Sequence, residues 1–414
     1  MLLYLHVPFC RRRCPYCGFH SSAPADEGRL AAWAQAIREE LALWGARPLP
    51  ADPPARPKEA PAAARAFGEV PVETVFFGGG TPSLLAPSQV AGIIAEIRRR
   101  FPLAADAEIT LEGNPDSLKE PGRLEGLAAA GINRLSMGAQ SLDDRELALL
   151  GRLHSAADVA TTVALARRAG FQNLGLDLMW ALPGQDCRAW LSTLSAALDL
   201  APDHVSAYAL TLEEGTAFAR RAAEGALPAL PGEEEAAAMF LEGGKLLAAR
   251  GLARYEISNF ARPGRHCRHN LGYWQGRDYL GLGPSAVSTV GNRRWTDTPD
   301  LGTWIREVRE GRPGHDAATL DAATRLRELV MLSLRTVAGL PLDIYRKKAG
   351  RPFCEAASPT GELATGLVAA GLATLDSRTL ALTERGLLVS NEVIAGLFER
   401  MDEEGVPLTD PGRP

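Results

Sequence analysis

Short apolar runs rich in β-branched and aromatic residues alternate, over the first two thirds of the chain, with longer stretches whose apolar positions recur at helical spacing. This alternation is typical of an α/β fold in which helices cover a parallel sheet. The expected strands are Leu2–Val7, Glu73–Phe77, Glu108–Leu111, Arg134–Met137, Asn173–Leu178, His204–Tyr208 and Arg254–Ile257. The helices expected between them include Glu27–Leu43, Ser88–Arg99, Asp143–Leu150, Ala156–Arg168, Cys187–Leu198 and Glu233–Ala249. Units of roughly 30 residues favour a βα barrel, or a partial TIM-type barrel, over a two-lobed open sheet.

We expect this first domain to span residues 1–292. Its first interval between strands is lengthened by residues 48–66, which are mostly Pro and Ala. We interpret that segment as a solvated loop insertion without catalytic content. Turn-forming residues around Arg293–Asp316 predict the junction to a second domain.

Residues 316–400 are expected to form this second, smaller domain, and residues 401–414 a tail. Its expected elements are helices at Ala323–Leu334, Thr360–Ala370 and Glu384–Arg400 and a two-strand pattern at Leu372–Leu382, which together suggest a winged-helix-like module. Winged helices can bind DNA, but residues 316–414 hold 11 Lys and Arg against 14 Asp and Glu. A DNA-binding surface needs clustered positive charge. We therefore expect a packing or substrate-covering role and no nucleic-acid partner.

Composition narrows the class of protein. The net charge of −5 over 414 residues does not call for a polyanionic partner. No apolar run approaches the roughly 18–20 residues that span a bilayer, and the N-terminus lacks the layout of a secretion signal. Three of the six cysteines crowd into one loop, which indicates metal ligation in a reducing compartment rather than a disulfide framework. We expect a cytoplasmic protein that is not integral to a membrane.

Those three cysteines, Cys10, Cys14 and Cys17, have the spacing CxxxCxxC. A closed zinc site or a fully ligated iron–sulfur cluster requires four ligands. Three thiolates can instead hold three corners of a 4Fe–4S cube and leave the fourth iron open to a small molecule. A zinc loop and thiols that merely pack are the alternatives.

Chemically distinctive residues follow several predicted strands, where a βα barrel keeps its reactive groups. Gly78-Gly79-Gly80-Thr81 follows the second strand, and glycines let the backbone approach a ligand that a β-carbon would block. Taken alone, such a triplet is usually a tight turn. Polar or charged residues at or after the next strands are Glu112, Gln140, Arg152 and Asp177. Each alone would be a solvated charge or a core residue, but their repetition at strand ends favours one shared ligand pocket.

The cysteine and glycine segments resemble those of the radical S-adenosylmethionine (SAM) family, and the resemblance extends from about Tyr4 to Gly283. It implies a 4Fe–4S cluster on Cys10, Cys14 and Cys17, with the open iron chelated by the amino and carboxylate groups of SAM. It also implies a set of SAM-binding residues, in which the glycine run cradles the amino group and the Gln and Arg meet the ribose and carboxylate. That set is Tyr4, Tyr16 (through its backbone), Gly79, Gly80, Thr81, Glu112, Gln140, Arg152 and Asp177.

Within this family, the chain resembles the branch that contains oxygen-independent coproporphyrinogen III dehydrogenase and haem chaperones. The dehydrogenase has a further cysteine two places after the third cluster ligand, where this chain has Phe19. The run from His269 to Trp274, HNxxYW, resembles the haem-binding motif of the chaperones. Imidazole can ligate haem iron, and two nearby aromatic rings can lie against a porphyrin. Cys267 is a competing soft ligand, and a structural loop histidine is the alternative for His269.

The resemblance implies a haem chaperone that delivers haem to haem proteins of a respiratory chain, which it would reach at the membrane surface. The alternative is the dehydrogenase reaction, an oxidative decarboxylation of coproporphyrinogen III. Phe19 and the HNxxYW run argue against that alternative. A radical SAM methylase or another haem-modifying enzyme on the same scaffold is a third hypothesis. Catalytic residues stay unassigned, and whether SAM is cleaved stays open.

Overall fold

The computed structural model describes residues 1–50, 65–354 and 358–405. Most of the Pro/Ala-rich segment predicted to be a loop insertion, and most of the predicted tail, lie outside these described residues.

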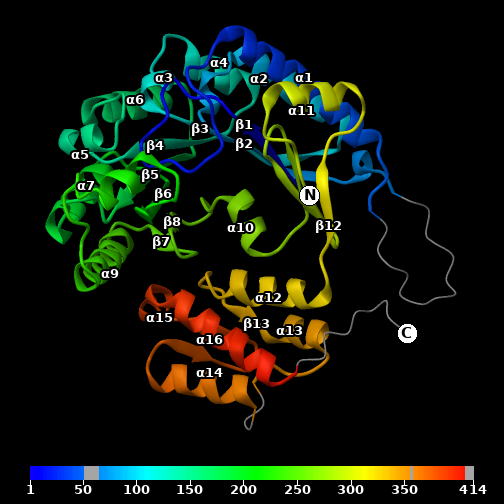
Figure 1. The fold of residues 1–414 in the computed structure, drawn as a ribbon. Coiled ribbons are helices and arrows are strands. Elements are labelled where there is room, and N and C mark those ends of the chain that lie inside the picture. Colours follow the sequence, from blue (N-terminus) through cyan, green and yellow to red (C-terminus); the bar gives the residue numbers. More distant parts are fainter. Residues whose placement is uncertain (51–64, 355–357, 406–414) are drawn as a thin grey trace, which may run out of the picture.

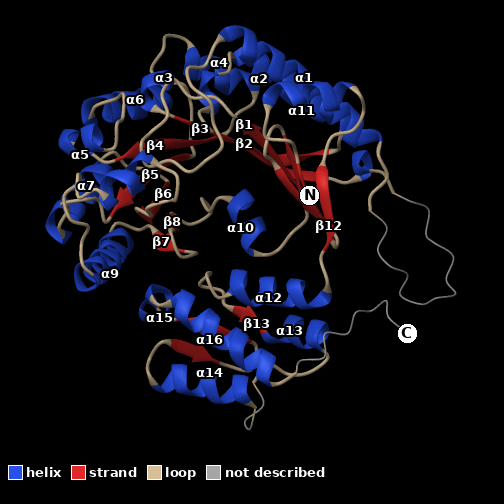
Figure 2. Ribbon diagram, viewed as in Figure 1, coloured by secondary structure: helices blue, strands red, loops and turns tan. Residues whose placement is uncertain are grey.

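A single sheet of twelve strands organises the first three quarters of the chain, in the order β12-β11-β10-β9-β1-β2-β3-β4-β5-β6-β8-β7 (Figure 2). Its strands are β1 (Leu2–Val7), β2 (Val72–Gly79), β3 (Leu103–Gly113), β4 (Arg134–Gln140), β5 (Leu174–Trp180), β6 (His204–Ala209), β7 (Ala253–Arg254), β8 (Asn259–Ala261), β9 (Tyr279–Leu282), β10 (Val287–Val290), β11 (Arg293–Thr296) and β12 (His315–Thr319). Strands β1 to β6 are parallel to one another, and β9 pairs in parallel with β1. Because the edge strands β12 and β7 are not neighbours in the described sheet, the arc is open. The expected α/β fold with a partial barrel is confirmed.

Helices cover the outer face of this arc (Figure 1). They are α1 (Glu27–Ala46), α2 (Pro87–Arg100), α3 (Pro115–Leu118), α4 (Arg123–Ala130), α5 (Asp144–Leu149), α6 (Ala156–Arg168), α7 (Cys187–Asp199), α9 (Glu233–Ala249) and α11 (Leu301–Arg309). The chain also has short 3₁₀ turns η1 (Phe67–Glu69) and η2 (Pro82–Leu84), and helix α8 (Ala217–Ala223), whose Phe218 packs against Tyr16 of the cysteine loop. Several begin where a side chain caps free backbone N–H groups, as Asp186 does for α7. The central strand β1 is almost wholly buried, as expected of a parallel strand with both faces covered.

Helix α10 (Arg268–Trp274) differs from these because it lies inside the arc, between the sheet and the C-terminal helices (Figure 1). Its Gly272 packs against Leu2 of β1 so closely that a β-carbon there would lie 2.4 Å from Leu2 Cδ1. The HNxxYW run forms this helix, so the motif fills the concave side of the sheet.

A second hydrophobic core begins at Leu326 and defines the C-terminal module. It contains α12 (Ala322–Ser333), β13 (Leu340–Pro341), α13 (Leu342–Ala349), α14 (Pro359–Ala369), β14 (Ala373–Leu375), β15 (Thr379–Leu382), α15 (Glu384–Leu388) and α16 (Ser390–Glu403). The three strands pair in the order β13-β15-β14 and the helices pack around them.

The first sheet continues past residue 292, where the sequence placed the end of the first domain. Strands β10 and β11 pair antiparallel across Gly291 and Asn292, and β12 pairs antiparallel with β11. Helix α11 packs on α1. The turn-forming residues of this region therefore connect β11, α11 and β12, which belong to the first sheet and its helical cover.

The prediction of one strand over Arg254–Ile257 is wrong. Strand β7 ends at Arg254, and the chain turns so that the Tyr255 N–H donates to Asn259 O at 3.1 Å. The Ile257 N–H donates to Arg335 O at 2.9 Å, and the Val337 N–H donates to Tyr255 O at 3.2 Å. The backbone of 255–257 thus pairs with a loop of the C-terminal module, a partner that local sequence cannot indicate.

Candidate functional site

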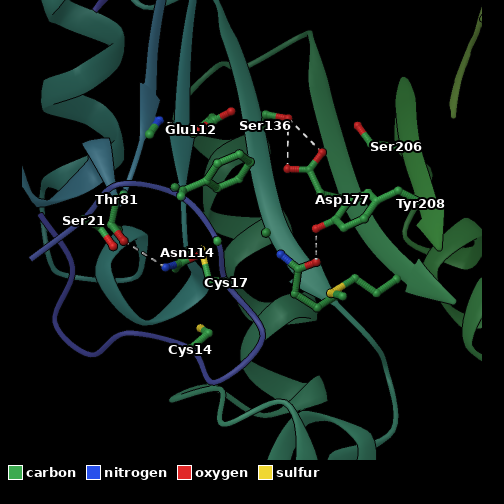
Figure 3. Close-up of a pocket in the computed structure, with 18 of the residues that line it drawn as sticks. Cys14, Cys17, Ser21, Thr81, Glu112, Asn114, Ser136, Asp177, Ser206 and Tyr208 are labelled. Atoms are coloured by element: carbon green, nitrogen blue, oxygen red, sulfur yellow. Dashed lines mark hydrogen bonds between the residues drawn. The ribbon is translucent and has the colours of Figure 1, made fainter. Parts of the chain in front are cut away.

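One cavity of about 730 Å³ lies at the carboxyl ends of the parallel strands, on the concave side of the sheet. Figure 3 shows Glu112, Ser136, Asp177 and Tyr208 on adjacent strands, with Cys14 and Cys17 on the loop beside them. The candidate ligands of the cluster, SAM and haem iron named from the sequence all line this cavity: Tyr4, Cys10, Cys14, Tyr16, Cys17, Gly79, Gly80, Thr81, Glu112, Gln140, Arg152, Asp177 and His269. Residues far apart in the chain therefore meet because parallel strands end at the same edge of the sheet.

The cysteines lie on the loop between β1 and α1, and each is half-buried. Backbone bonds anchor the start of this loop, since the Cys10 N–H donates to Ser22 O at 3.0 Å. A turn follows, in which the Cys17 N–H donates to Cys14 O at 3.1 Å. Burial raises the pKa of the Cys17 thiol, and the neighbouring cysteines raise that pKa further. A cationic iron centre would offset this cost, because the thiolate is the form that binds metal.

The chemistry of these donors suits an iron–sulfur cluster, which is held by cysteine thiolates. Within the described residues, no three His, Cys, Asp or Glu side chains are already gathered in a metal-binding arrangement.

The glycine run provides a backbone surface facing the cavity. Gly79 has φ of +110°, and its N–H donates to Glu112 Oε2 at 3.1 Å. At Gly80, a β-carbon would lie 2.5 Å from the carbonyl oxygen of Phe9. Neither position tolerates a side chain, because atoms of His6 and Phe9 fill the space that a β-carbon would need. The role of these glycines as a cradle for SAM stays a prediction.

Two carboxyl groups face the same space. Asp177 accepts hydrogen bonds from Ser136 Oγ at 3.0 and 3.2 Å, drawn as dashed lines in Figure 3. Burial, followed by the charge of Asp177, raises the pKa of Glu112 to about 8, although the Gly79 N–H lowers it. Burial likewise raises the pKa of Asp177. Such a pair is suited to a ligand that brings positive charge or hydroxyl donors, as SAM does.

Replacing Glu112 with glutamine is expected to stabilise the ligand-free protein at neutral and alkaline pH. The raised pKa means that the folded state favours the protonated acid, so wild-type stability falls as pH rises from about 4.5 to about 8. At roughly 1.4 kcal/mol per pKa unit, the loss amounts to a few kcal/mol. Thermal unfolding from pH 5 to 9 would measure it. Parallel Tm curves for wild type and variant would contradict the assignment.

Arg152 lies on the cysteine side of the cavity. Its Nη1 donates to Cys14 Sγ at 3.4 Å, and its Nη2 donates to Gly138 O at 2.8 Å and to Asn114 Oδ1 at 2.5 Å. Its Nε is buried without a partner in the described part of the chain. Gln140, with φ of +68°, accepts a hydrogen bond from the Tyr208 hydroxyl at 2.6 Å.

Sequence reasoning did not assign three polar residues that organise the cavity. Asn114 bonds both Arg152 and Thr81, Ser136 bonds Asp177, and Tyr208 bonds Gln140. Asn114 follows the end of β3 and Tyr208 is near the end of β6, which is the signal that could have found these two, whereas Ser136 is the third residue of β4 and gives no such signal.

His269 borders the cavity but is only 1% exposed, and both of its ring nitrogens have partners. Nδ1 lies 2.7 Å from Thr74 Oγ1, and Nε2 lies 3.1 Å from the Tyr273 hydroxyl. Its ring also stacks on Phe76, with 5.0 Å between centroids. Burial lowers the pKa of His269 to about 3, so the imidazole is neutral at physiological pH.

The other residues of the HNxxYW region divide between the cavity and its surroundings. Tyr273 lines the cavity, whereas Trp274 is not among the lining residues. Cys267, the competing soft ligand, also lines the cavity, and its thiol donates to Glu108 Oε1 at 3.7 Å. Burial raises the pKa of Cys267 to about 12, which keeps the thiol protonated.

Among the described residues, none of the helices combines the length and the apolar character needed to cross a bilayer.

Comparison with known proteins agrees with the geometry. The profile of the radical SAM superfamily matches residues 4–196, and that of the HemN C-terminal domain matches residues 320–389. The chain is 38% identical to the mitochondrial radical S-adenosyl methionine domain-containing protein 1 of Bos taurus, over 97% of this chain and 88% of that protein. It is 37% identical to the haem chaperone HemW of Mycobacterium tuberculosis, over 96% of this chain and 94% of that protein.

A solved structure of coproporphyrinogen III oxidase, HemN, from Escherichia coli superposes with a TM-score of 0.77 at 24% identity, covering 96% of this chain and 89% of that chain. This likeness demonstrates the shared fold, including the C-terminal module.

Proposed function

Because this chain belongs to the radical SAM superfamily, in the family that includes the haem chaperone HemW, we propose that it binds haem and delivers it to haem proteins. One observation carries the proposal: the similarity at 37% identity covers nearly the full length of both chains. The oxidase, by contrast, shares the fold at 24% identity, and the position of its further cysteine holds Phe19 here.

Members of the superfamily use a 4Fe–4S cluster and SAM. In this chain Cys10, Cys14 and Cys17 would hold the cluster, which with SAM supplies one-electron chemistry. The Gly79–Thr81 backbone would receive the amino group of SAM, and Arg152 would receive its carboxylate, for which a guanidinium is well suited. The remaining SAM-binding residues would be Tyr4, Tyr16, Glu112, Gln140 and Asp177.

His269 is the proposed axial ligand of the haem iron. A proton on Nδ1, accepted by Thr74 Oγ1 at 2.7 Å, would leave a lone pair on Nε2 for the metal. Within the described residues, the hydrogen-bond partner of that nitrogen is the Tyr273 hydroxyl, at 3.1 Å. Haem ligation therefore requires the Tyr273 hydroxyl to release Nε2. Loss of the His269 ring should weaken haem binding, whereas loss of the Tyr273 hydroxyl should strengthen it.

Replacing His269 with alanine should weaken haem binding about tenfold or more and reshape its Soret band, because an axial ligand is lost. Replacing Tyr273 with phenylalanine should strengthen haem binding a few-fold, because it removes the hydroxyl that competes for Nε2. Haem titration of cluster-loaded protein under anaerobic conditions measures both. Unchanged binding in both variants would move the ligand to Cys267 or elsewhere.

The same anaerobic, cluster-loaded protein can be used to distinguish a haem chaperone from a coproporphyrinogen III dehydrogenase. Incubation with coproporphyrinogen III, SAM and a reductant should give no decarboxylated product, while haem binds and passes to an acceptor apoprotein. Product formation, or the absence of haem binding by the wild type, would overturn the proposed function.

We further propose a cytoplasmic location with haem proteins of the respiratory chain as acceptors. The crowded cysteines support the reducing compartment, and the acidic surplus among residues 316–414 argues against nucleic acid as a partner.

A further inference from the structure

The loop that carries the cysteines also presents an aromatic side chain to solvent. Phe19 is 68% exposed, the largest exposure of any large apolar side chain in the described residues, and it lines the cavity. Scattered exposed apolar residues are normal on protein surfaces. This one is different because it stands at the entrance of the candidate site, where a flat apolar ligand could cover it.

The three arginines that precede Cys14 have different surroundings. Arg11 pairs with Asp116 and Glu120, and Arg12 donates to the carbonyl oxygens of Gly151 and Arg152. Arg13 is exposed, lines the cavity, and within the described residues makes one long hydrogen bond, to Cys17 O at 3.4 Å. Its guanidinium therefore keeps most of its donors for a ligand, and carboxylates are what such a fork binds well.

A volume of about 730 Å³ falls within the roughly 300–1,000 Å³ typical of a pocket for one small-molecule ligand. The cluster and SAM would occupy this space. Both ring nitrogens of His269 are already engaged in hydrogen bonds, with Thr74 and Tyr273. A haem that arrives while both cofactors are bound needs contacts nearer the entrance.

We propose that haem first binds at this entrance, with its porphyrin face on Phe19 and a propionate on Arg13. This inference rests on the proposed function and deepens it. Both contacts match the ligand, because porphyrin is a flat aromatic system with two carboxylates at one edge. Glu213 also lines the entrance, close to Gly18. Its negative charge repels a propionate, so the carboxylate edge faces Arg13 and points away from Glu213.

Haem titration of full-length, cluster-loaded protein tests this entrance site with Phe19→Ala and Arg13→Ala. We expect Phe19→Ala to bind haem about tenfold more weakly, because stacking and apolar contact are lost. We expect Arg13→Ala to bind haem about threefold more weakly, because an exposed ion pair with a propionate is lost. Haem dimethyl ester, whose propionates are capped, should bind wild type and Arg13→Ala equally. Leu230→Ala and Arg145→Ala, exposed residues outside the cavity lining, are matched controls and should bind as the wild type does. Iron and sulfide content must equal wild type in every variant.

The outcomes are distinguishable. If the wild type binds no haem, the proposed function fails and the entrance site fails with it. If the wild type binds haem and both variants bind it equally well, the entrance site is overturned while the chaperone proposal stands. If Phe19→Ala keeps haem affinity but slows transfer to an acceptor, Phe19 contacts the acceptor protein, and the entrance site is again overturned.

Discussion

Replacing Cys14 with alanine is expected to abolish cluster assembly. Two thiolates cannot hold the three corners of a cube that leaves one iron open, and the cavity offers no fourth thiol on the same loop, since position 19 is phenylalanine. We expect the visible absorbance of the cluster and the inorganic sulfide content to fall at least tenfold after anaerobic reconstitution.

Cys187→Ala is the matched control for that experiment, because Cys187 is also half-buried but begins α7, outside the cavity lining. It should reconstitute like the wild type. A wild-type spectrum and sulfide content in Cys14→Ala, or zinc in place of iron in the wild type, would reject the ligand assignment.

Replacing Gly80 with alanine is expected to produce the second large loss, that of SAM binding. A β-carbon at this position would lie 2.5 Å from Phe9 O and 2.9 Å from Phe9 C and N. These are backbone atoms next to Cys10, so no side-chain rotation relieves the clash, and the cysteine loop must shift. Overpacking of this kind costs roughly 1–3 kcal/mol, and the shift also misplaces the cradle. We expect SAM affinity to fall at least about thirtyfold by calorimetry.

Gly92→Ala provides the control, because Gly92 lies within α2 and an added β-carbon there meets nothing within 4 Å. Alanine at this helical position should preserve SAM binding and raise stability by up to about 1 kcal/mol. Wild-type SAM affinity in Gly80→Ala would show that the glycine run does not contact the ligand.

The parallel part of the sheet was predictable because its strands are short buried runs separated by amphipathic helices. Strands β1 to β6 each overlap a predicted strand, and the cavity lies at their carboxyl ends. Because parallel strands end at the same edge of a sheet, the sequence alone could predict that Glu112, Gln140 and Asp177 lie close together. Knowledge of the family added Tyr4 and Tyr16, which otherwise look like core residues.

Features that depend on distant partners were not predictable. Nothing near Tyr255 in the sequence indicates that its backbone pairs with residues 335–337, and this pairing is why the predicted strand ends early. The sequence also could not show that Thr74 and Tyr273 would occupy both nitrogens of His269. Hydrogen-bond partners of a buried side chain are set by tertiary packing, and local periodicity carries no information about them.

The backbone pairing between residues 255–257 and 335–337 joins the sheet domain to the C-terminal module. Tyr255 has its backbone tied to the C-terminal module, and its hydroxyl lies 2.7 Å from His204 Nε2 and accepts from the Cys267 N–H at 3.3 Å. His204 and Cys267 both line the cavity, so a displacement of the C-terminal module would be transmitted through Tyr255 to the cavity wall.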